Sequence, residues 1–550
     1  MTTKGRNPGS ADFSVRTLDP LVVEAGLASL LITNSKMPEV LASPANGRDT
    51  EQSSQKQTAA KFIRDVFFSN LPLPFLKLRT YLWLVVLSHA FGPSGYGTWS
   101  LFYVTLGWTT VVASMTLGSS MMRFASGEKS TQETNQILSS VVAAVSTAAA
   151  TIGFLFIIFS KPLANLIFRG SEYRNLLFLL AGILFVDLLY EEMRGLLRAK
   201  RLNRTWAFFT LARVAPETLV TLAIAWRLKS VFVTLGTYLA GGALAVGGGM
   251  LYLVRYQNFR LVKPSRAILS RYIPYGLSLV PGGLASALSF NADRYLVAYY
   301  LDLKQVGIYS VCFTISALGF FFVGPINDVL LPEMSVLYDA GDWDNCHRRF
   351  SGIQKFVFGL SVGFTALLVT FPQHILRILT TPDFLSGNYI LAILGLQGVF
   401  MSLLMLYIVV LNVRLRVLST SLVWAGIGAL VILIEIVLVP RIGLLGAALA
   451  QLISSIAGAA VVIGLNWQLF RRTFLASWVL QTGVAFAGVY ATAFLWPSNF
   501  AGFFPSVARL IVGTATFILG LAVTGYLGLR DVKLLRHALF VTKLEPRGCS

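Results

Sequence analysis

Two cations stand in the first long apolar segment of the chain: Lys77 and Arg79, which follow Pro72 and Pro74. An ionisable group at bilayer depth costs about 2.5–3.5 kcal/mol on insertion scales, so each one needs a partner or a function. A proline can begin a half-helix, whose first turn is partly positive, and Lys77 adds a full charge there. We therefore expect a break at the prolines, followed by a site for a phosphate or diphosphate. The alternative is that the span begins later, which would leave both cations at the cytoplasmic surface.

Four charged residues share one face of the fourth apolar segment. Asp187, Glu191, Arg194 and Arg198 are separated by steps of four, three and four, which places them on a single helical face. A stripe of mixed sign can neutralise itself through i,i+4 pairs, and it can equally line a cavity. Both interpretations stay open, with Asp187 the deepest of the four.

The fifth segment holds a further pair of opposite charges. Arg213 and Glu217 flank Pro216 at an i,i+4 spacing, which favours mutual neutralisation over a place in a cavity. Arg213 is nevertheless a third candidate, beside Lys77 and Arg79, for binding an anionic head group.

Acidic residues at bilayer depth are candidates for coupling to an ion. Asp293 and Arg294 lie near the outer end of the seventh segment, where they either face the cavity or lock two helices together. Asp328 lies near the inner end of the eighth segment. Carboxylates within membrane segments mark ion pathways, so Asp187, Glu217 and Asp328 are candidates for coupling to H⁺ or Na⁺.

The composition places these residues in a membrane protein. The chain has 550 residues, of which 55% are hydrophobic and 13% charged, against about 25% charged in a soluble domain. Its excess of 20 positive charges sits in the loops, which favours a membrane over nucleic acid as the partner. Three cysteines and four histidines form no metal, haem or catalytic pattern, and no phosphate-binding loop occurs. We expect no catalytic residue, metal or cofactor, and no enzyme activity.

Fourteen apolar segments are each long enough to cross about 30 Å of hydrocarbon. They lie near 65–90, 98–122, 137–160, 175–197, 205–226, 231–254, 272–299, 306–332, 352–376, 387–412, 417–439, 444–468, 474–496 and 504–528. The loops alternate in charge, with 19 lysines and arginines in one set against 8 in the other. The positive-inside rule then predicts an even number of spans in the plasma membrane, with both termini cytoplasmic.

A five-residue pattern indicates that the spans are duplicated. Residues 96–100 and 306–310 both read Gly-x-aromatic-Ser after their first residue, and each copy opens an apolar segment. Six spans separate the copies, so the two halves point the same way across the membrane, as in parallel repeats. We predict an all-α protein with two six-helix lobes around a central cavity, plus two extra C-terminal helices. The pattern itself is expected to mark equivalent helix starts and to bind nothing.

These observations divide the chain into six parts. The polar N-terminal stretch is typical of a disordered tail, within which Met37 is an alternative start. The predicted parts are a cytoplasmic tail at 1–60, an N-lobe at 61–256, a cytoplasmic linker at 257–272, a C-lobe at 273–470, two last spans at 471–529 and a cytoplasmic tail at 530–550.

Several short motifs in this order resemble one transporter family over about residues 62–470. They are Ala90–Gly97, Leu117–Ser120 leading to Arg123-Phe124, Asp293-Arg294 before Val306–Ser310, Leu331-Pro332-Glu333, and Pro440–Gly443 with Gly446–Ala448. This order is similar to that of polysaccharide exporters, the oligosaccharide-lipid flippases of the multidrug/oligosaccharidyl-lipid/polysaccharide (MOP) superfamily. The resemblance implies two lobes around a cavity that opens alternately to either side.

The resemblance also implies a substrate and partners. We expect a polyprenyl-diphosphate-linked glycan whose lipid tail stays among the membrane lipids, with association with polysaccharide polymerase machinery. Three alternatives remain. A cationic-drug antiporter of the same superfamily would need a net-anionic cavity, against which Lys77 and Arg79 argue. A lipid II flippase has a similar span count. A membrane glycosyltransferase or polymerase would need a large polar loop, which the sequence lacks.

Overall fold

The computed structural model describes residues 68, 71–125, 130–414, 417–495 and 502–527, which belong to one compact unit, Asp65–Ser550. The predicted tails at 1–60 and 530–550 lie outside these residues. Within them, every regular element is a helix, as predicted. The elements are α3 (Pro72–Ser114), α4 (Leu117–Phe124), α5 (Thr131–Ile158), α6 (Ser160–Phe168), η1 (Ser171–Tyr173), α7 (Arg174–Ala199), α8 (Asn203–Leu228), α9 (Val231–Tyr256), α10 (Arg266–Tyr300), α11 (Leu303–Ser316), α12 (Leu318–Phe321), α13 (Val323–Asp339), α14 (Trp343–Thr370), α15 (Pro372–Leu379), η2 (Pro382–Gly387), α16 (Asn388–Val413), α17 (Val417–Ile442), α18 (Leu444–Leu465), α19 (Trp467–Thr473), α20 (Ala476–Leu495) and α21 (Phe503–Val523).

Helix α3 is a hairpin that reverses at Gly92. In a straight helix, Trp83 and Tyr103 would be about 30 Å apart at 1.5 Å per residue, but their ring centroids are 5.2 Å apart. Gly92 has φ +63° and ψ −174°, a conformation that glycine adopts without steric cost. Pro93 follows it and begins the returning arm, where a missing N–H is tolerated. The turn falls where the sequence predicts the end of the first span.

The break predicted at Pro72 and Pro74 is not found. Both prolines lie in the first turn of α3, and Gly92 is the residue within α3 that departs from helical geometry. A proline is accommodated in a first turn because the N–H groups there have no partner inside the helix. No second half-helix therefore starts at Pro74.

A test of helix length and composition finds fewer membrane spans than the sequence predicts. Among the described residues, ten helices are long and apolar enough to cross a membrane, or up to twelve if each of two bent pairs is one span. The test omits α7, which is 26 residues long but carries several charges. It also counts α3 and α4 together as one span, although the two arms of the α3 hairpin correspond to two predicted spans. These two places are where the count of twelve and the predicted fourteen differ, so fourteen stays a prediction.

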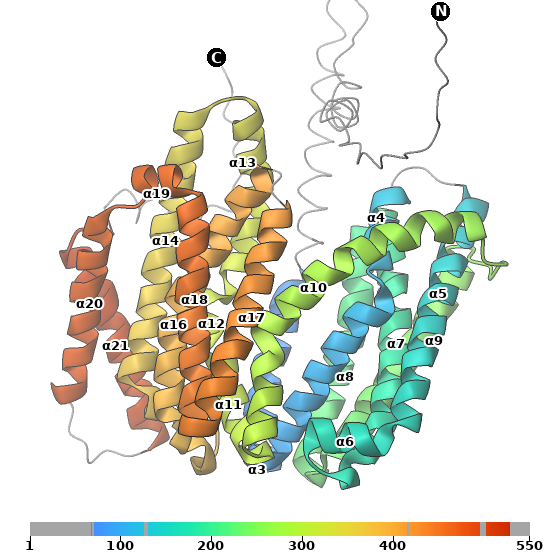
Figure 1. The fold of residues 1–550 in the computed structure, drawn as a ribbon, viewed down its shortest axis with the longest axis horizontal. Coiled ribbons are helices and arrows are strands. Elements are labelled where there is room, and N and C mark those ends of the chain that lie inside the picture. The colour runs from blue at the N-terminus through green and yellow to red at the C-terminus, as the bar shows by residue number, and fades with distance from the viewer. Residues whose placement is uncertain (1–67, 69–70, 126–129, 415–416, 496–501, 528–550) are drawn as a thin grey trace, which may run out of the picture. The chain divides into compact units, whose positions relative to one another are not determined.

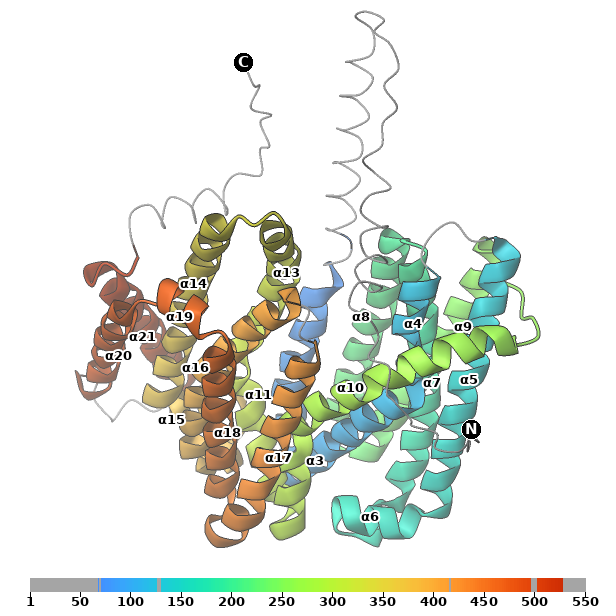
Figure 2. The ribbon, with the colours of Figure 1, turned by 45° about the horizontal axis from the view of Figure 1, so that its top comes forward.

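The helices form two bundles joined by α10 (Figure 1). One bundle holds α3 to α9 and the other α11 to α18, while α10 crosses obliquely from the first to the second in both ribbon views (Figure 2). The first half of α10 accepts hydrogen bonds at the carbonyls of Tyr272 and Gly276 from Ser120 and Thr116, at 3.0 and 2.6 Å. Its second half reaches α17, where Ser289 Oγ donates to the Trp424 carbonyl at 2.8 Å. The two lobes are thus linked by one continuous helix.

The two copies of the five-residue pattern pack directly against each other. A Cβ atom at Gly97 would lie 2.0 Å from the Leu303 carbonyl oxygen, and one at Gly307 would lie 1.9 Å from the Pro93 carbonyl oxygen. One turn further along, Ser100 Oγ donates to Ser310 Oγ at 2.8 Å across 210 positions. The contact is reciprocal, as two related helix starts would make it. The pattern does mark equivalent helix starts, and it also joins the lobes.

Helices α20 and α21 lie beside the second bundle, away from α10 (Figure 1). Phe517 packs where Gly363 of α14 has no side chain, since a Cβ there would lie 2.5 Å from the ring. Gln481 Nε2 of α20 donates to the Thr524 carbonyl at 2.9 Å, just beyond α21. The last two helices therefore pack on the C-lobe as an addition, as the sequence predicts.

We expect Gly307→Ala to destabilise the protein, because the added methyl group meets backbone atoms that cannot move independently. Overpacking of this kind costs about 1–3 kcal/mol. The measurement is thermal unfolding of the purified protein in detergent. Gly107→Ala is the matched control, since a Cβ there would meet no atom within 4 Å. Equal transition temperatures for the two variants would contradict the contact.

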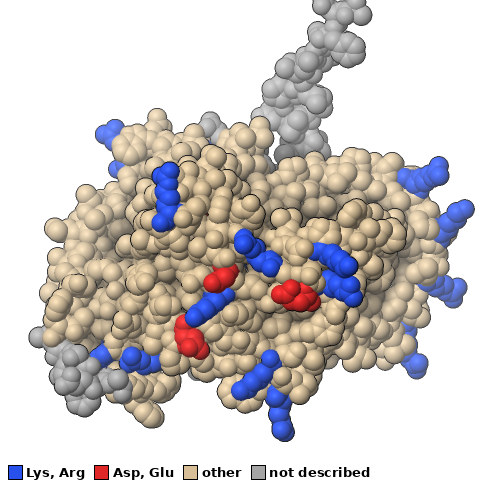
Figure 3. All heavy atoms as spheres, turned by 60° about the horizontal axis from the view of Figure 1, so that its bottom comes forward, with Lys and Arg blue, Asp and Glu red and all other residues tan. Residues whose placement is uncertain are grey.

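The exposed residues Ser94 and Lys304 are expected to face the outside of the cell. Both lie beside the contact between α3 and α11. Figure 3 shows the molecule with the bottom of Figure 1 turned forward, and a few acidic side chains lie there among basic ones. Cysteines at these two positions should react in intact cells with a maleimide that does not cross membranes. Asp344→Cys, in the first turn of α14, should react only after the membrane is opened. The reverse pattern of labelling would overturn the predicted orientation.

Candidate substrate cavity

A cavity of about 400 Å³ lies between the two lobes, directly inside the Ser100–Ser310 contact. Both arms of the α3 hairpin line it, together with α10 and the end of α11. The lining residues are Arg79, Thr80, Trp83, Tyr96, Trp99, Ser100, Tyr103, Val104, Gly107, Trp108, Ala287, Asn291, Arg294 and Thr314. The cavity is therefore where the sequence predicts it, between the halves of a duplicated protein.

Two arginines reach this cavity, one from each lobe. Arg79 comes from the first arm of α3, where its guanidinium lies 4.6 Å from the ring centre of Trp83. Arg294 comes from the second half of α10 and lies 4.5 Å from the ring centre of Phe313. Among the described residues, these are the two cations that line the cavity. Cations held over aromatic faces in this way stay charged away from bulk water.

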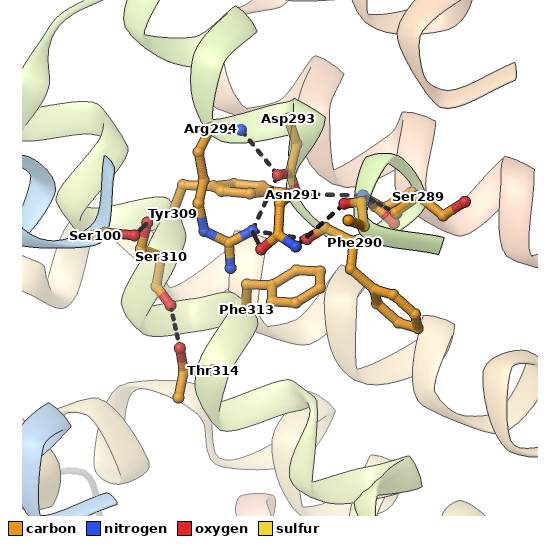
Figure 4. Close-up of polar contacts among 12 residues, drawn as sticks. Ser100, Ser289, Phe290, Asn291, Asp293, Arg294, Tyr309, Ser310, Phe313 and Thr314 are labelled. Carbon is orange, nitrogen blue, oxygen red and sulfur yellow. Dashed lines mark hydrogen bonds and ion pairs between the residues drawn. The ribbon is translucent and has the colours of Figure 1, made fainter. Parts of the chain in front are cut away.

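Arg294 is held in place by its neighbours (Figure 4). Its Nη1 donates to the Phe290 carbonyl at 2.8 Å, to Asp293 Oδ1 at 3.0 Å and to Asn291 Oδ1 at 3.4 Å. Nη2 has no dashed line in the close-up and no hydrogen bond within the described residues. One edge of the guanidinium is thus fixed and the other is available to a ligand.

Asp293 beside it is a fully satisfied carboxylate. It accepts hydrogen bonds from Tyr309 Oη at 2.7 Å, Gln451 Nε2 at 3.2 Å, and both the backbone N and Nη1 of Arg294 at 2.8 and 3.0 Å. Four donors therefore hold this buried carboxylate in place. The pair Asp293–Arg294 therefore links α10 to α11 and α18 and also presents a cation to the cavity.

Arg79 is held by a second network inside the N-lobe. Its Nη1 lies 3.4 Å from Glu217 Oε1, while Arg213 Nε lies 2.8 Å from Glu217 Oε2. Arg213 also forms an ion pair with Asp187 of α7, which accepts a hydrogen bond from Tyr238 Oη at 3.2 Å. Two acids and two arginines thus form a neutral cluster that reaches the cavity only at Arg79.

The predicted head-group set of Lys77, Arg79 and Arg213 is not brought together. Arg213 is buried inside the N-lobe, and the ammonium of Lys77 lies 3.1 Å from the ring centre of Phe321 in the C-lobe. Residues two apart on a helix point about 200° away from each other, so Lys77 and Arg79 cannot face one site from the same helix. Among the described residues, the second cation that lines the cavity is Arg294.

The charged stripe of the fourth span is divided between different partners. Asp187 pairs with Arg213, whereas Arg194 Nη1 pairs with Glu191 at 2.7 Å near the surface. The guanidinium of Arg198 stacks 4.3 Å from Trp206 instead of joining an acid on its own helix. The stripe therefore neutralises itself only at Glu191 and Arg194, and of its four members Asp187 joins the network behind the cavity.

Asp328 does not line the cavity. It is exposed on α13, and its charge acts on Arg198 of the N-lobe. Two buried acids were not among the candidates. Glu192 is 2% exposed, and Glu435 is fully buried with no hydrogen-bond partner on either carboxylate oxygen in the described structure. An isolated acid in an apolar span was a signal for Glu435, whereas nothing in the sequence separates Glu192 from its neighbour.

Comparison with known proteins agrees with this architecture. A family model described as "Polysaccharide biosynthesis protein" matches residues 70–337. The uncharacterised membrane protein MJ1068 of Methanocaldococcus jannaschii is 23% identical over 291 residues, which is 52% of this chain and 55% of that protein. The chain thus spans about half the length of this relative.

Solved transporter structures share the fold. The lipid II flippase MurJ in an inward closed conformation matches 85% of this chain and 100% of its own, with 16% identity and a TM-score of 0.65. An inward-facing MATE multidrug transporter of the MOP superfamily matches 74% of this chain and 95% of its own, with 13% identity and a TM-score of 0.58. Residues 70–337 therefore match the polysaccharide biosynthesis protein model, and the described chain shares its fold with these two solved transporters, as the motifs predicted.

Proposed function

We propose that this protein flips polyprenyl-diphosphate-linked oligosaccharide units across the plasma membrane for the synthesis of extracellular polysaccharide, with both of its termini in the cytoplasm. The observation that carries the proposal is the pair of guanidinium groups, Arg79 and Arg294, which meet one cavity from different lobes. An anion bound by both would connect the lobes, so its arrival or departure would favour one arrangement of the lobes over another.

The two arginines fit a diphosphate. Neither Nη2 atom makes a hydrogen bond within the described residues, while each Nη1 is held by a carboxylate. A guanidinium binds phosphate oxygens through two parallel N–H groups, which makes arginine the residue best suited to this anion. A diphosphate carries enough oxygens to accept hydrogen bonds from both side chains at once.

The rest of the cavity wall fits a glycan. Trp83, Trp99 and Tyr103 contact one another through their rings at centroid distances of 5.2 to 5.5 Å, and Trp108 packs on Tyr295 at 6.2 Å. Aromatic residues offer an apolar face and a polar edge together, which suits the mixed surface of a sugar ring. The lipid tail would remain in the bilayer, and a polysaccharide polymerase outside the described chain would use the flipped unit.

We expect Arg79→Gln to weaken binding of undecaprenyl diphosphate to the purified protein by on the order of 10–100-fold. The loss corresponds to one charge-assisted hydrogen-bonded contact, worth about 1.5–3 kcal/mol. Arg294→Gln should have a comparable effect. Binding can be followed by quenching of tryptophan fluorescence, since Trp83 contacts Arg79 at 4.6 Å.

Lys77→Gln is the matched control, because this neighbouring cation contacts Phe321 and does not line the cavity. It should bind the lipid within about twofold of the unmodified protein. Equal losses in Lys77→Gln and Arg79→Gln would contradict the assignment. Tighter binding of a cationic dye than of the lipid would favour a drug antiporter, and preference for lipid II over other lipid-linked glycans would favour a lipid II flippase.

A further inference from the structure

Glu217 is shared between the cavity and the interior of the N-lobe. One of its carboxylate oxygens faces Arg79 at 3.4 Å and the other accepts from Arg213 Nε at 2.8 Å. Its side chain is 2% exposed, whereas that of Arg79 is 21% exposed. The buried acid thus senses the cavity through a single exposed guanidinium.

Among the described residues, the cations that pair with Glu217 are Arg79 and Arg213. The titratable and charged groups that act on it or on its partners are Arg79 and Tyr103 of α3, Asp187 and Tyr190 of α7, Arg213 of α8 and Tyr238 of α9. Arg213 serves two acids, since it also pairs with Asp187. The cluster is neutral only while Arg79 is counted with it.

An anion in the cavity changes this balance. A diphosphate on Arg79 competes with Glu217 for the same guanidinium and brings further negative charge within a few ångströms. Two carboxylates then share Arg213 in a site away from bulk water, where an unneutralised charge is costly. Binding of one proton restores neutrality without any movement of the helices.

We propose that Glu217 takes up a proton from water when an anionic lipid head group binds Arg79, and releases it when the head group leaves. This inference rests on the proposed function, because it assumes a diphosphate at Arg79. Linkage makes the effect reciprocal, so a proton on Glu217 also strengthens binding of the anion. The loaded protein would then carry less net negative charge through the membrane field than the head group alone.

Glu217 is a better acceptor than the other buried acids. Asp187 has both a cation and the Tyr238 hydroxyl and does not contact Arg79. Asp293 already accepts four hydrogen bonds, none of them from Arg79. Glu435 has no hydrogen-bond partner in the described structure and does not line the cavity, and the charges that act on it are Asp293 and Arg294, not Arg79.

The test compares affinity for undecaprenyl diphosphate at two pH values on the full chain in detergent. With one linked proton, the dissociation constant rises by up to tenfold per pH unit above neutrality. We expect this dependence in the unmodified protein and in the matched control Glu435→Gln, and less than a twofold change in Glu217→Gln. Titration of the lipid itself is common to all three proteins and cancels in the comparison.

A second measurement needs no variant at the acid. Infrared difference spectra of the unmodified protein should gain a protonated carboxylic acid band when undecaprenyl diphosphate is added. Arg79→Gln should not gain the band at saturating lipid, because in that variant Glu217 has no shared cation to lose. The same pH dependence in Glu217→Gln as in the control, or no new band in the unmodified protein, would overturn the inference.

Failure of the proposed function would look different. If undecaprenyl diphosphate did not bind the unmodified protein, or bound Arg79→Gln equally well, the diphosphate site and this inference would both fall. If Arg79→Gln weakened binding but Glu217→Gln kept the full pH dependence, the site would stand and only the proton assignment would be wrong.

Discussion

The close approach of α3 and α11 fixes the position of everything that lines the cavity. Gly97 and Gly307 let the two helix backbones touch, where a single added carbon would lie about 2 Å from a carbonyl oxygen. The serine pair one turn further shows that the helices are still in contact there. The cavity lies directly beside this contact, because Tyr96, Trp99 and Ser100 line it together with Tyr103. Because backbone atoms make this contact, the movement of a single side chain cannot loosen it. Separation of the lobes at this end would therefore require the whole interface to part.

Charge is the second constraint, and it is met within each lobe. The N-lobe neutralises Asp187 and Glu217 with Arg213 and Arg79, and the C-lobe neutralises Asp293 with Arg294. Neutral clusters of this kind can be buried at bilayer depth, whereas isolated charges cannot. Among the described residues, the charged groups that line the cavity are therefore the two guanidinium groups, each with one edge unpaired.

Features that depend on composition and on the order of the spans could be predicted from the sequence. Apolar spans, the duplication and the cavity between its halves follow from patterns that any membrane protein of this kind must show. The pairing of charges was not predictable in the same way. Arg213 and Asp187 lie on different helices, 26 positions apart, and helical periodicity carries no information on which neighbour faces which. Helical periodicity does predict that Lys77 and Arg79 point in different directions. The sequence alone therefore argued against placing both cations in one site.

The duplication preserves shape but not chemistry. The offset of 210 that joins Ser100 to Ser310 carries Arg213 and Glu217 onto Val423 and Ile427, which are apolar. In the other direction it carries Arg294 onto Leu84. These three charged residues therefore have apolar counterparts, whereas Arg79 and Asp187 fall opposite Ser289 and Gln397, which are polar but uncharged. A linear substrate with one anionic group needs lobes that differ in their charged residues. Two identical lobes would offer the same charges at equivalent depths, so they would not distinguish the head group from the rest of the molecule. If the substrate is the proposed lipid-linked glycan, the asymmetry between the lobes matches the polarity of that molecule.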